Sequence, residues 1–260
     1  MRFDWLETMQ QRQRATVFEG RYASDQGFEA VMVASRQKLI VELIDRLRPT
    51  VVIEVGCGLD MLRRAVAKAG PDIARWIIVE PCVAFVEEAG KTLADIAGVE
   101  IKQGFFEAVA AEINPDGGAD LIVMSGLLHE VPDPLSLLAA ARGVLAPAGI
   151  LHVNVPHTLS LHRRIGRVMG LIADESEPSD RNKHFLHYSS GFDRGSLTEL
   201  VGRAGLKVVD EGGYLVKPFT HEQMAAIASV IAPEVIDGLW QIGRELPEIA
   251  SEIFVNAGLP

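Results

Sequence analysis

The chain has little of what marks several common classes of protein. Two cysteines among 260 residues argue against a disulfide framework and favour a reducing compartment. No uninterrupted apolar run approaches the roughly 20 residues that a membrane span needs, and the N-terminal stretch MRFDWLETMQQRQR has no apolar core of a signal peptide. Only 25 Lys and Arg face 35 Asp and Glu, and this net charge of −10 argues against a nucleic-acid-binding surface. We therefore expect a cytoplasmic protein without a membrane or nucleic-acid partner.

The composition is that of an ordinary globular protein, with 48% apolar and 23% charged residues. Its length suits one large α/β domain with a small accessory layer. We expect an N-terminal helical cap over residues 1–48, an α/β domain over 49–219 and C-terminal helices over 220–260. A long insertion at 156–194 interrupts the α/β pattern, and such a connection is usually functional, often as a lid.

From Val51 the apolar pattern alternates between short strands and helices. Strands are predicted at 51–55, 75–79, 99–102, 119–124, 149–155, 206–211 and 214–219. Helices are predicted at 60–69, 82–97, 105–112 and 134–145, and in the C-terminal part as helices that restart at Pro233 and Pro247. The early strands are continuously apolar, as in a parallel sheet that helices cover on both faces. Gly212 and Gly213 predict a tight hairpin, which makes the last strand antiparallel.

The turn after the first strand is the main candidate for a ligand site. Glu54-Val55-Gly56-Cys57-Gly58 joins a buried strand to a helix, an arrangement that presents backbone N–H groups to a ligand. Glu54 is a carboxylate at the end of a buried strand, and burial of a charged group costs free energy unless a partner or ligand compensates it. Open α/β sheets bind ligands at the carboxyl ends of their strands. Three more polar or aromatic stretches follow the next strands: Glu80-Pro81, Gly104-Phe105-Phe106-Glu107 and Ser125 to Glu130.

These stretches suggest separate tasks. The Glu80 carboxylate can accept hydrogen bonds from both hydroxyls of a ribose. Phe105 or Phe106 can face a flat base, and the other belongs to the core. Cys57 and Cys82 are predicted to be small packing residues rather than reactive thiols.

Together the motifs resemble the class I S-adenosylmethionine (SAM) dependent methyltransferases over about residues 50–219. The matching pieces are VVIEVGCG, VEP, GFFE, DLIVMSGLLHEVPDP and LLAAARGVLAPAGILHVNVP. The resemblance implies a Rossmann-like seven-stranded sheet, mostly parallel with an antiparallel last strand, and SAM as the cofactor. It also implies ligand contacts: Glu54, Gly56, Cys57 and Gly58 at the methionine end, Glu80 and Pro81 at the ribose, Phe105 or Phe106 near the adenine, and Ser125, Gly126 and His129 around the methyl group. The family often has a third glycine where this chain has Asp60.

Two other functions stay open at this point. A dinucleotide-binding dehydrogenase shares the fold, but its third glycine position holds Met61 here, which fits poorly. A non-catalytic partner protein with the SAM fold is the other alternative, and the intact glycine turn with Glu54 and Glu80 argues against it.

A base is needed if the acceptor is an alcohol or an ammonium, and histidine titrates near neutral pH. His129 is the first candidate because it follows the fourth strand, and it can instead hold its loop. His184 and His187, in NKHFLHYSS, come next, with Tyr188 beside them as a substrate contact. On a helix these two rings would share a face, but no carboxylate cluster completes a metal site, so we expect no metal.

The segment SLHRRIGRVMGLI predicts contacts to the acceptor. Arg163 and Arg167 share a helical face and can clamp a phosphate or carboxylate, the alternative being a solvated basic face. His162 and His221 are expected on the surface or on the lid. The stretches NVPHTLSLHRRIGRVMGLI and GGYLVKPF also look like bacterial methyltransferases encoded with glycan or natural-product pathways, which implies a sugar or sugar-nucleotide acceptor.

We therefore hypothesise a SAM-dependent methyltransferase that acts on a small molecule at oxygen, with nitrogen as the alternative. Apolar C-terminal side chains fit either packing of the lid or the face of a homodimer: Leu239, Trp240, Ile249 and Phe254.

Overall fold

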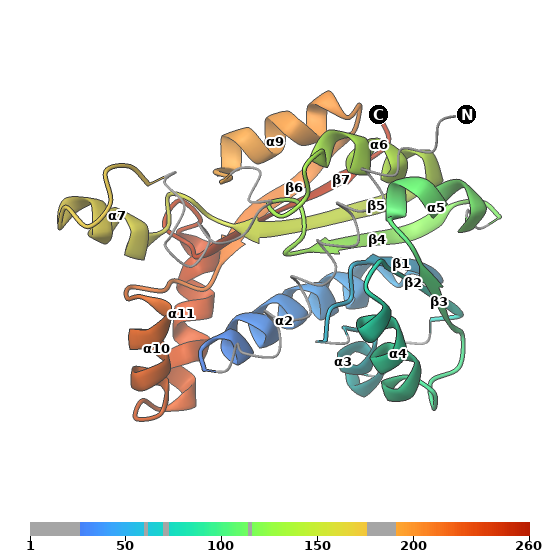
Figure 1. The fold of residues 1–260 in the computed structure, drawn as a ribbon. Coiled ribbons are helices and arrows are strands. Elements are labelled where there is room, and N and C mark those ends of the chain that lie inside the picture. Colours follow the sequence, from blue (N-terminus) through green and yellow to red (C-terminus); the bar gives the residue numbers. More distant parts are fainter. Residues whose placement is uncertain (1–26, 60–61, 70–72, 114–115, 176–190) are drawn as a thin grey trace.

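The computed structural model describes residues 27–59, 62–69, 73–113, 116–175 and 191–260. Its described strands form one seven-stranded sheet in the order β3-β2-β1-β4-β5-β7-β6 (Figure 1). The strands are β1 Val51–Val55, β2 Arg75–Glu80, β3 Val99–Gln103, β4 Ala119–Ser125, β5 Leu145–Pro156, β6 Lys207–Tyr214 and β7 Glu252–Gly258. Neighbours among β1 to β5 pair in parallel, whereas β7 runs antiparallel to both β5 and β6. The predicted α/β class with a mostly parallel seven-stranded sheet and one reversed strand is confirmed.

Helices cover both faces of this sheet (Figure 1). On one face lie α2 Glu29–Leu47, α3 Leu62–Ala69 and α4 Val83–Thr92, and on the other α5 Phe106–Ile113, α6 Pro134–Val144 and α9 Arg194–Arg203. Beyond the carboxyl ends of the parallel strands lie α7 Leu161–Val168, α10 His221–Ala228 and α11 Pro233–Glu245. No helix among the described residues is long and apolar enough to span a membrane.

Side chains of the central strands alternate between the two faces. In β1, Val52 packs in the layer of α2 and α3, whereas Ile53 and Val55 pack in the layer of α5 and α6. Every second residue therefore reaches the same core, the period of a β-strand. Glu54 shares its face with Val52, so its side chain lies on the side of the sheet that α2 and α3 cover.

The predicted position of the reversed strand is wrong. There is no hairpin at Gly212-Gly213 because β6 continues through both glycines to Tyr214. A Cβ on Gly212 would lie 2.9 Å from the ring of Phe254, and one on Gly213 would lie 2.6 Å from Cβ of Ala250. These glycines make room for neighbouring side chains, a use that local sequence does not separate from a turn.

The reversed strand is β7, which the sequence predicted as part of a helix from Pro247. All seven of its residues are buried, since it lies between two strands and beneath helices on both sides. Such a strand has no solvent-exposed face, and its sequence lacks the clear apolar–polar alternation that identifies half-buried strands. The helices predicted before it are present as α10 and α11. Trp240 and Phe254 are 3% and 2% exposed in a core with α2, so they pack inside the chain rather than on a dimer face.

Candidate functional site

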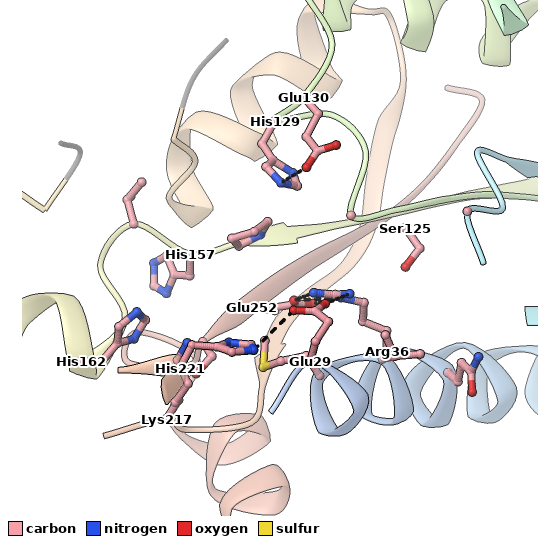
Figure 2. Close-up of a pocket in the computed structure, with 18 of the residues that line it drawn as sticks. Glu29, Arg36, Ser125, His129, Glu130, His157, His162, Lys217, His221 and Glu252 are labelled. Atoms are coloured by element: carbon pink, nitrogen blue, oxygen red, sulfur yellow. Dashed lines mark hydrogen bonds and ion pairs between the residues drawn. The ribbon is translucent and has the colours of Figure 1, made fainter. Parts of the chain in front are cut away.

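A cavity of about 600 Å³ opens where β1, β4 and β5 end and β7 begins (Figure 2). Its wall includes the turn after β1, the loop after β4, the chain after β5, and parts of α2, α7 and α10. Its size is within the range of small-molecule sites, about 300–1,000 Å³. We call the part around residues 54–58 and 125–126 the cofactor end, and the part lined by α2, α7 and residues 217–222 the acceptor end.

The glycine turn forms the wall of the cofactor end. Gly56 has φ 75° and Gly58 has φ 53°, in the left-handed region that glycine adopts readily. The Gly56 N–H donates to the carbonyl of Val79 at 2.9 Å, which ties the turn to β2. Gly56, Cys57 and Gly58 all line the cavity.

Glu54 also lines the cavity from the end of β1. Its Oε2 accepts a hydrogen bond from the indole N–H of Trp76 at 2.8 Å. Burial raises the pKa of Glu54 to about 7, although the bond from Trp76 opposes this rise and the nearby charge of Glu80 adds to it. A cation in the cavity would therefore gain a carboxylate partner that can be ionised near neutral pH.

Glu80 lies against the far side of the same turn. Its carboxylate accepts from the N–H of Cys82 at 2.9 Å and from that of Gly58 at 3.4 Å. Burial raises its pKa, and these backbone bonds oppose the rise. Burial, together with the charges of Glu54 and Glu80, raises the pKa of the Cys57 thiol, so Cys57 is a packing residue in character.

The two phenylalanines after β3 differ in exposure. Phe106 is 2% exposed and packs in the core beneath α5, so it is the member of the pair that belongs to the core and not the ligand contact. Phe105 is partly buried, and its contact with an adenine stays a prediction. Pro81 is partly buried at the end of β2, and neither it nor Phe105 belongs to the wall of the cavity.

The loop after β4 closes the cavity between its two ends. Ser125, Gly126 and His129 all line it. Gly126 has φ 63°, and a Cβ there would meet nothing within 4 Å. His129 is 7% exposed, with Nε2 3.5 Å from a carboxylate oxygen of Glu130.

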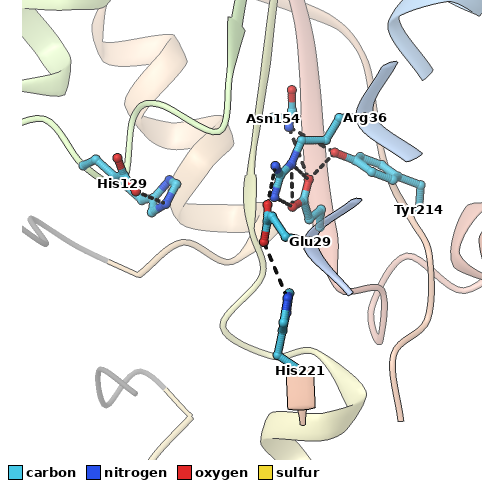
Figure 3. Close-up of polar contacts among 8 residues, drawn as sticks. Glu29, Arg36, His129, Asn154, Tyr214 and His221 are labelled. Atoms are coloured by element: carbon cyan, nitrogen blue, oxygen red, sulfur yellow. Dashed lines mark hydrogen bonds and ion pairs between the residues drawn. The ribbon is translucent and has the colours of Figure 1, made fainter. Parts of the chain in front are cut away.

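A buried polar network supports the wall of the acceptor end (Figure 3). Arg36 Nε donates to both carboxylate oxygens of Glu252, at 2.8 and 3.0 Å. Glu252 also accepts from the hydroxyl of Tyr214 and from the amide of Asn154. Burial alone would raise the pKa of Glu252, but the Arg36 guanidinium holds it below its ordinary value. Arg36 also donates to Glu29 at 2.9 Å, which fixes this α2 side chain in the cavity wall.

Three more histidines line the acceptor end, and the sequence did not predict them as residues of the site. His157 is 3% exposed, and its Nδ1 lies 3.0 Å from the carbonyl of Ala250. His162 and His221, predicted on the surface or lid, are partly buried in the cavity wall (Figure 2). Only His157, directly after a predicted strand, carried a usable positional signal.

Of the two arginines predicted to contact the acceptor, only one lines the cavity. Arg163 lines the cavity, and its Nε donates to the carbonyl of Glu175 at 2.6 Å. Arg167 is outside the cavity wall and forms an ion pair with Glu175, so the structure does not bring it to the cavity with Arg163. His184, His187 and Tyr188 lie outside the described residues.

The cofactor end fits SAM. The glycine turn leaves its backbone open to the cavity, and Gly126 leaves open space opposite it. Glu54, which the resemblance assigns to the methionine ammonium, lines this end. Glu80, which the resemblance assigns to the ribose, is not part of the cavity wall and supports the turn through the N–H groups of Gly58 and Cys82.

Comparisons with known proteins agree with this fit. A family model described as a methyltransferase domain matches residues 32–211. The C-methyltransferase NovU of Streptomyces niveus is 28% identical over 254 residues, which are 90% of this chain and 54% of the relative. A ubiquinone biosynthesis O-methyltransferase of Xanthomonas campestris pv. campestris is 28% identical over 172 residues, 65% of this chain and 68% of the relative. The chain spans about half the length of NovU and of a trans-aconitate 2-methyltransferase, 54% and 46%.

A solved structure gives the same fold. The SAM-dependent methyltransferase from Clostridium acetobutylicum aligns with a TM-score of 0.54 at 11% identity, over 95% of this chain and 98% of that one. The strand order, the glycine turn and the family match agree, and they favour the methyltransferase over the dehydrogenase. The chain belongs to the methyltransferase domain family, as a class I methyltransferase whose cofactor is S-adenosylmethionine.

Proposed function

We propose that the chain transfers the SAM methyl group to an oxygen of a small molecule, such as a sugar, a sugar nucleotide or a natural product. The observation that carries this proposal is a single cavity that joins the glycine turn after β1 to an end lined by histidines from separate segments. SAM, when bound, supplies a methyl carbon on a positively charged sulfur. The acceptor oxygen would take this methyl group, and the sulfur would keep the electron pair of the carbon–sulfur bond.

The acceptor proton must go to a base, and His157 is the base that the geometry supports best. Its Nδ1–H donates to the carbonyl of Ala250, which leaves the lone pair on Nε2. Burial lowers the pKa of His157, and this keeps the ring neutral at pH 7. His129, beside Glu130 on the loop after β4, is the second candidate.

Methylation at carbon is a second candidate function. NovU, which matches 90% of this chain, is named a C-methyltransferase. Removal of a proton from a phenol, or from a carbon beside a carbonyl, leaves a negative charge that oxygen and carbon share. The same base would therefore serve methylation at oxygen or at carbon.

The test is a transfer assay with SAM carrying an isotopically labelled methyl group and a panel of sugars, sugar nucleotides, phenols and amines. We expect labelled product from at least one hydroxyl-bearing acceptor, with the label on oxygen by NMR. Label on nitrogen or on carbon would replace the oxygen assignment. S-adenosylhomocysteine binding without transfer to any acceptor would favour the non-catalytic alternative.

A further inference from the structure

We infer that the hydroxyl of Ser251 selects the acceptor through a hydrogen bond to a second oxygen, carried by the carbon next to the one whose oxygen is methylated. The inference rests on the proposed function, because it names a substrate class for the same cavity. The acceptors that it singles out have two oxygens on adjacent carbons, as in a vicinal diol, a catechol or a hydroxy ketone.

Ser251 is a buried polar side chain for which the fold supplies no partner. It directly precedes β7, is 4% exposed and lines the cavity. Among the described residues its Oγ has no hydrogen-bond partner. A buried hydroxyl that makes no hydrogen bond costs about 1–3 kcal/mol, and most buried polar groups in native proteins have a partner. A ligand in the cavity that accepts this bond would remove the cost.

The backbone of Ser251 is fixed from two sides. Its N–H donates to the carbonyl of Leu215 at 2.7 Å, and its carbonyl accepts from the N–H of His157 at 3.0 Å. Leu215 is fully buried and has φ 56°, a left-handed conformation that residues other than glycine seldom adopt. The side chain of Ser251 is therefore held at a fixed place in the cavity wall by bonds in which its hydroxyl takes no part. Only rotation about the Cα–Cβ bond remains to aim that hydroxyl.

Ser251 lies opposite the proposed base. Strands β5 and β7 pair Pro156 with Glu252, and the bond from His157 to Ser251 continues this antiparallel register by one residue. Opposite residues in such a pair have Cβ atoms about 4.5–5.5 Å apart. His157 also lines the cavity (Figure 2). Its Nδ1 is bonded to the carbonyl of Ala250, so Nε2 is the nitrogen that an acceptor would meet.

Two oxygens on adjacent carbons fit this pair of side chains. The hydroxyl to be methylated would donate to Nε2 of His157, and the neighbouring oxygen would accept from Ser251. Oxygens on adjacent carbons lie within hydrogen-bond distance of each other, so neighbouring side chains can bind both at once. An acceptor with a single oxygen would leave the Ser251 hydroxyl buried without a partner, and a site built to bond a polar group rejects the analogue that lacks it.

The neighbouring polar side chains of this wall are already bonded within the chain. The hydroxyl of Thr158 donates to the carbonyl of Phe192 at 3.1 Å. The carboxylate of Glu252 accepts from Arg36 at 2.8 Å. Ser251 differs from them, because a ligand can engage its hydroxyl without breaking a bond within the chain.

The test is a calorimetric titration of the full chain, loaded with S-adenosylhomocysteine, with two matched pairs of small acceptors. Catechol is compared with phenol, and 2-hydroxycyclohexanone with cyclohexanol, so that the members of each pair differ by one adjacent oxygen. We expect the member with two oxygens to bind about tenfold or more tightly in at least one pair, the effect of one buried hydrogen bond made or left unmade. Ser251→Ala should abolish this preference. Ser229→Ala, a matched change at an exposed serine outside the cavity wall, should leave it unchanged.

Two results would overturn the inference: equal affinities within both pairs, as expected if an ordered water bonds Ser251, or a preference that Ser251→Ala leaves intact. If Ser251→Ala does not fold, Ser251→Cys in the same titration decides, because a thiol is a weak donor, and an unchanged preference there overturns the inference. Methyl transfer whose kcat/KM does not depend on the adjacent oxygen removes the inference and leaves the proposed function. A preference in binding that depends on Ser251, without any methyl transfer, removes the proposed function and leaves the selectivity of Ser251.

Discussion

The two ends of the cavity are built from the chain in different ways. The cofactor end comes mainly from one run of consecutive residues, Glu54 to Gly58, with Ser125 and Gly126 beside it and the end of the neighbouring strand β2 as support. The acceptor end comes from α2, α7, the chain after β6 and the start of β7, and its Arg36–Glu252 pair joins residues 216 positions apart. A local motif fixes the common ligand, whereas distant segments shape the site for the variable one. Substitutions at one end should therefore spare the ligand of the other.

The largest effect is expected from His157→Asn at the acceptor end. Loss of the proposed base should lower kcat by about 10²–10⁴-fold, because Asn keeps a donor for the Ala250 carbonyl but cannot take a proton. Affinity for S-adenosylhomocysteine should stay the same. Steady-state kinetics with the acceptor found in the transfer assay give the first quantity, and calorimetry gives the second.

His129→Asn is the matched variant for this comparison. A larger fall of kcat in His129→Asn than in His157→Asn would move the base to the loop after β4. A loss of cofactor affinity in His157→Asn would contradict the separation of the two ends.

Glu252→Ala is expected to lower the free energy of unfolding by about 3–5 kcal/mol, since it leaves the Arg36 charge without its main partner. Glu211→Ala is the control on the neighbouring strand β6. Glu211 pairs with Arg194 at 2.6 Å with both side chains about a third exposed, and exposed pairs contribute about 0–1 kcal/mol. Urea unfolding of both variants checks the difference, and equal losses would show that the network does not hold the acceptor end.

At the cofactor end, Glu54 should make stability depend on pH. Its pKa is about 7 in the fold and 4.5 without it, so between these values the folded state binds more protons than the unfolded state. The contribution of Glu54 to the stability of the unliganded chain should therefore fall by about 3 kcal/mol as pH rises from about 4.5 to about 7. Urea unfolding across this range should show a weaker decline for Glu54→Gln, and the same decline in both chains would contradict the assignment.

The smallest effect is expected from Arg167→Gln, which lies outside both ends. Its pair with Glu175 is largely exposed on the arginine side, so its loss should change the free energy of unfolding by less than about 1 kcal/mol. The KM of the acceptor should stay the same, whereas Arg163→Gln should raise it. A rise of KM in Arg167→Gln would place that arginine at the substrate after all.

The contrast between neighbouring and distant residues also explains which predictions from the sequence succeeded. The strands around the glycine turn were predicted correctly, and Glu54, Gly56 and Gly58 lie together in one cavity wall, because each depends on residues close in sequence. Their contacts to the cofactor stay a prediction. The cofactor was confirmed through the family that these residues resemble.

The failures involve distant packing. Gly212 and Gly213 make room for Phe254 and Ala250, so the residues that require glycine at these positions lie some 40 positions later in the chain. The sequence around Glu252 predicts a helix, and the contact of Glu252 with Arg36 is visible only in the structure. Phe106 rather than Phe105 entered the core because α5 begins there and turns it toward the sheet. None of these pairings leaves a local pattern.

Calorimetric titration of S-adenosylhomocysteine into the wild-type chain, Glu80→Ala and Lys217→Gln tests the separation of the two ends most directly. We predict tight binding to the wild type, a loss of about a hundredfold or more in Glu80→Ala because two bonds to a charged group are removed, and unchanged binding in Lys217→Gln. Equal binding to Glu80→Ala and the wild type, or a matching loss in Lys217→Gln, would contradict the account.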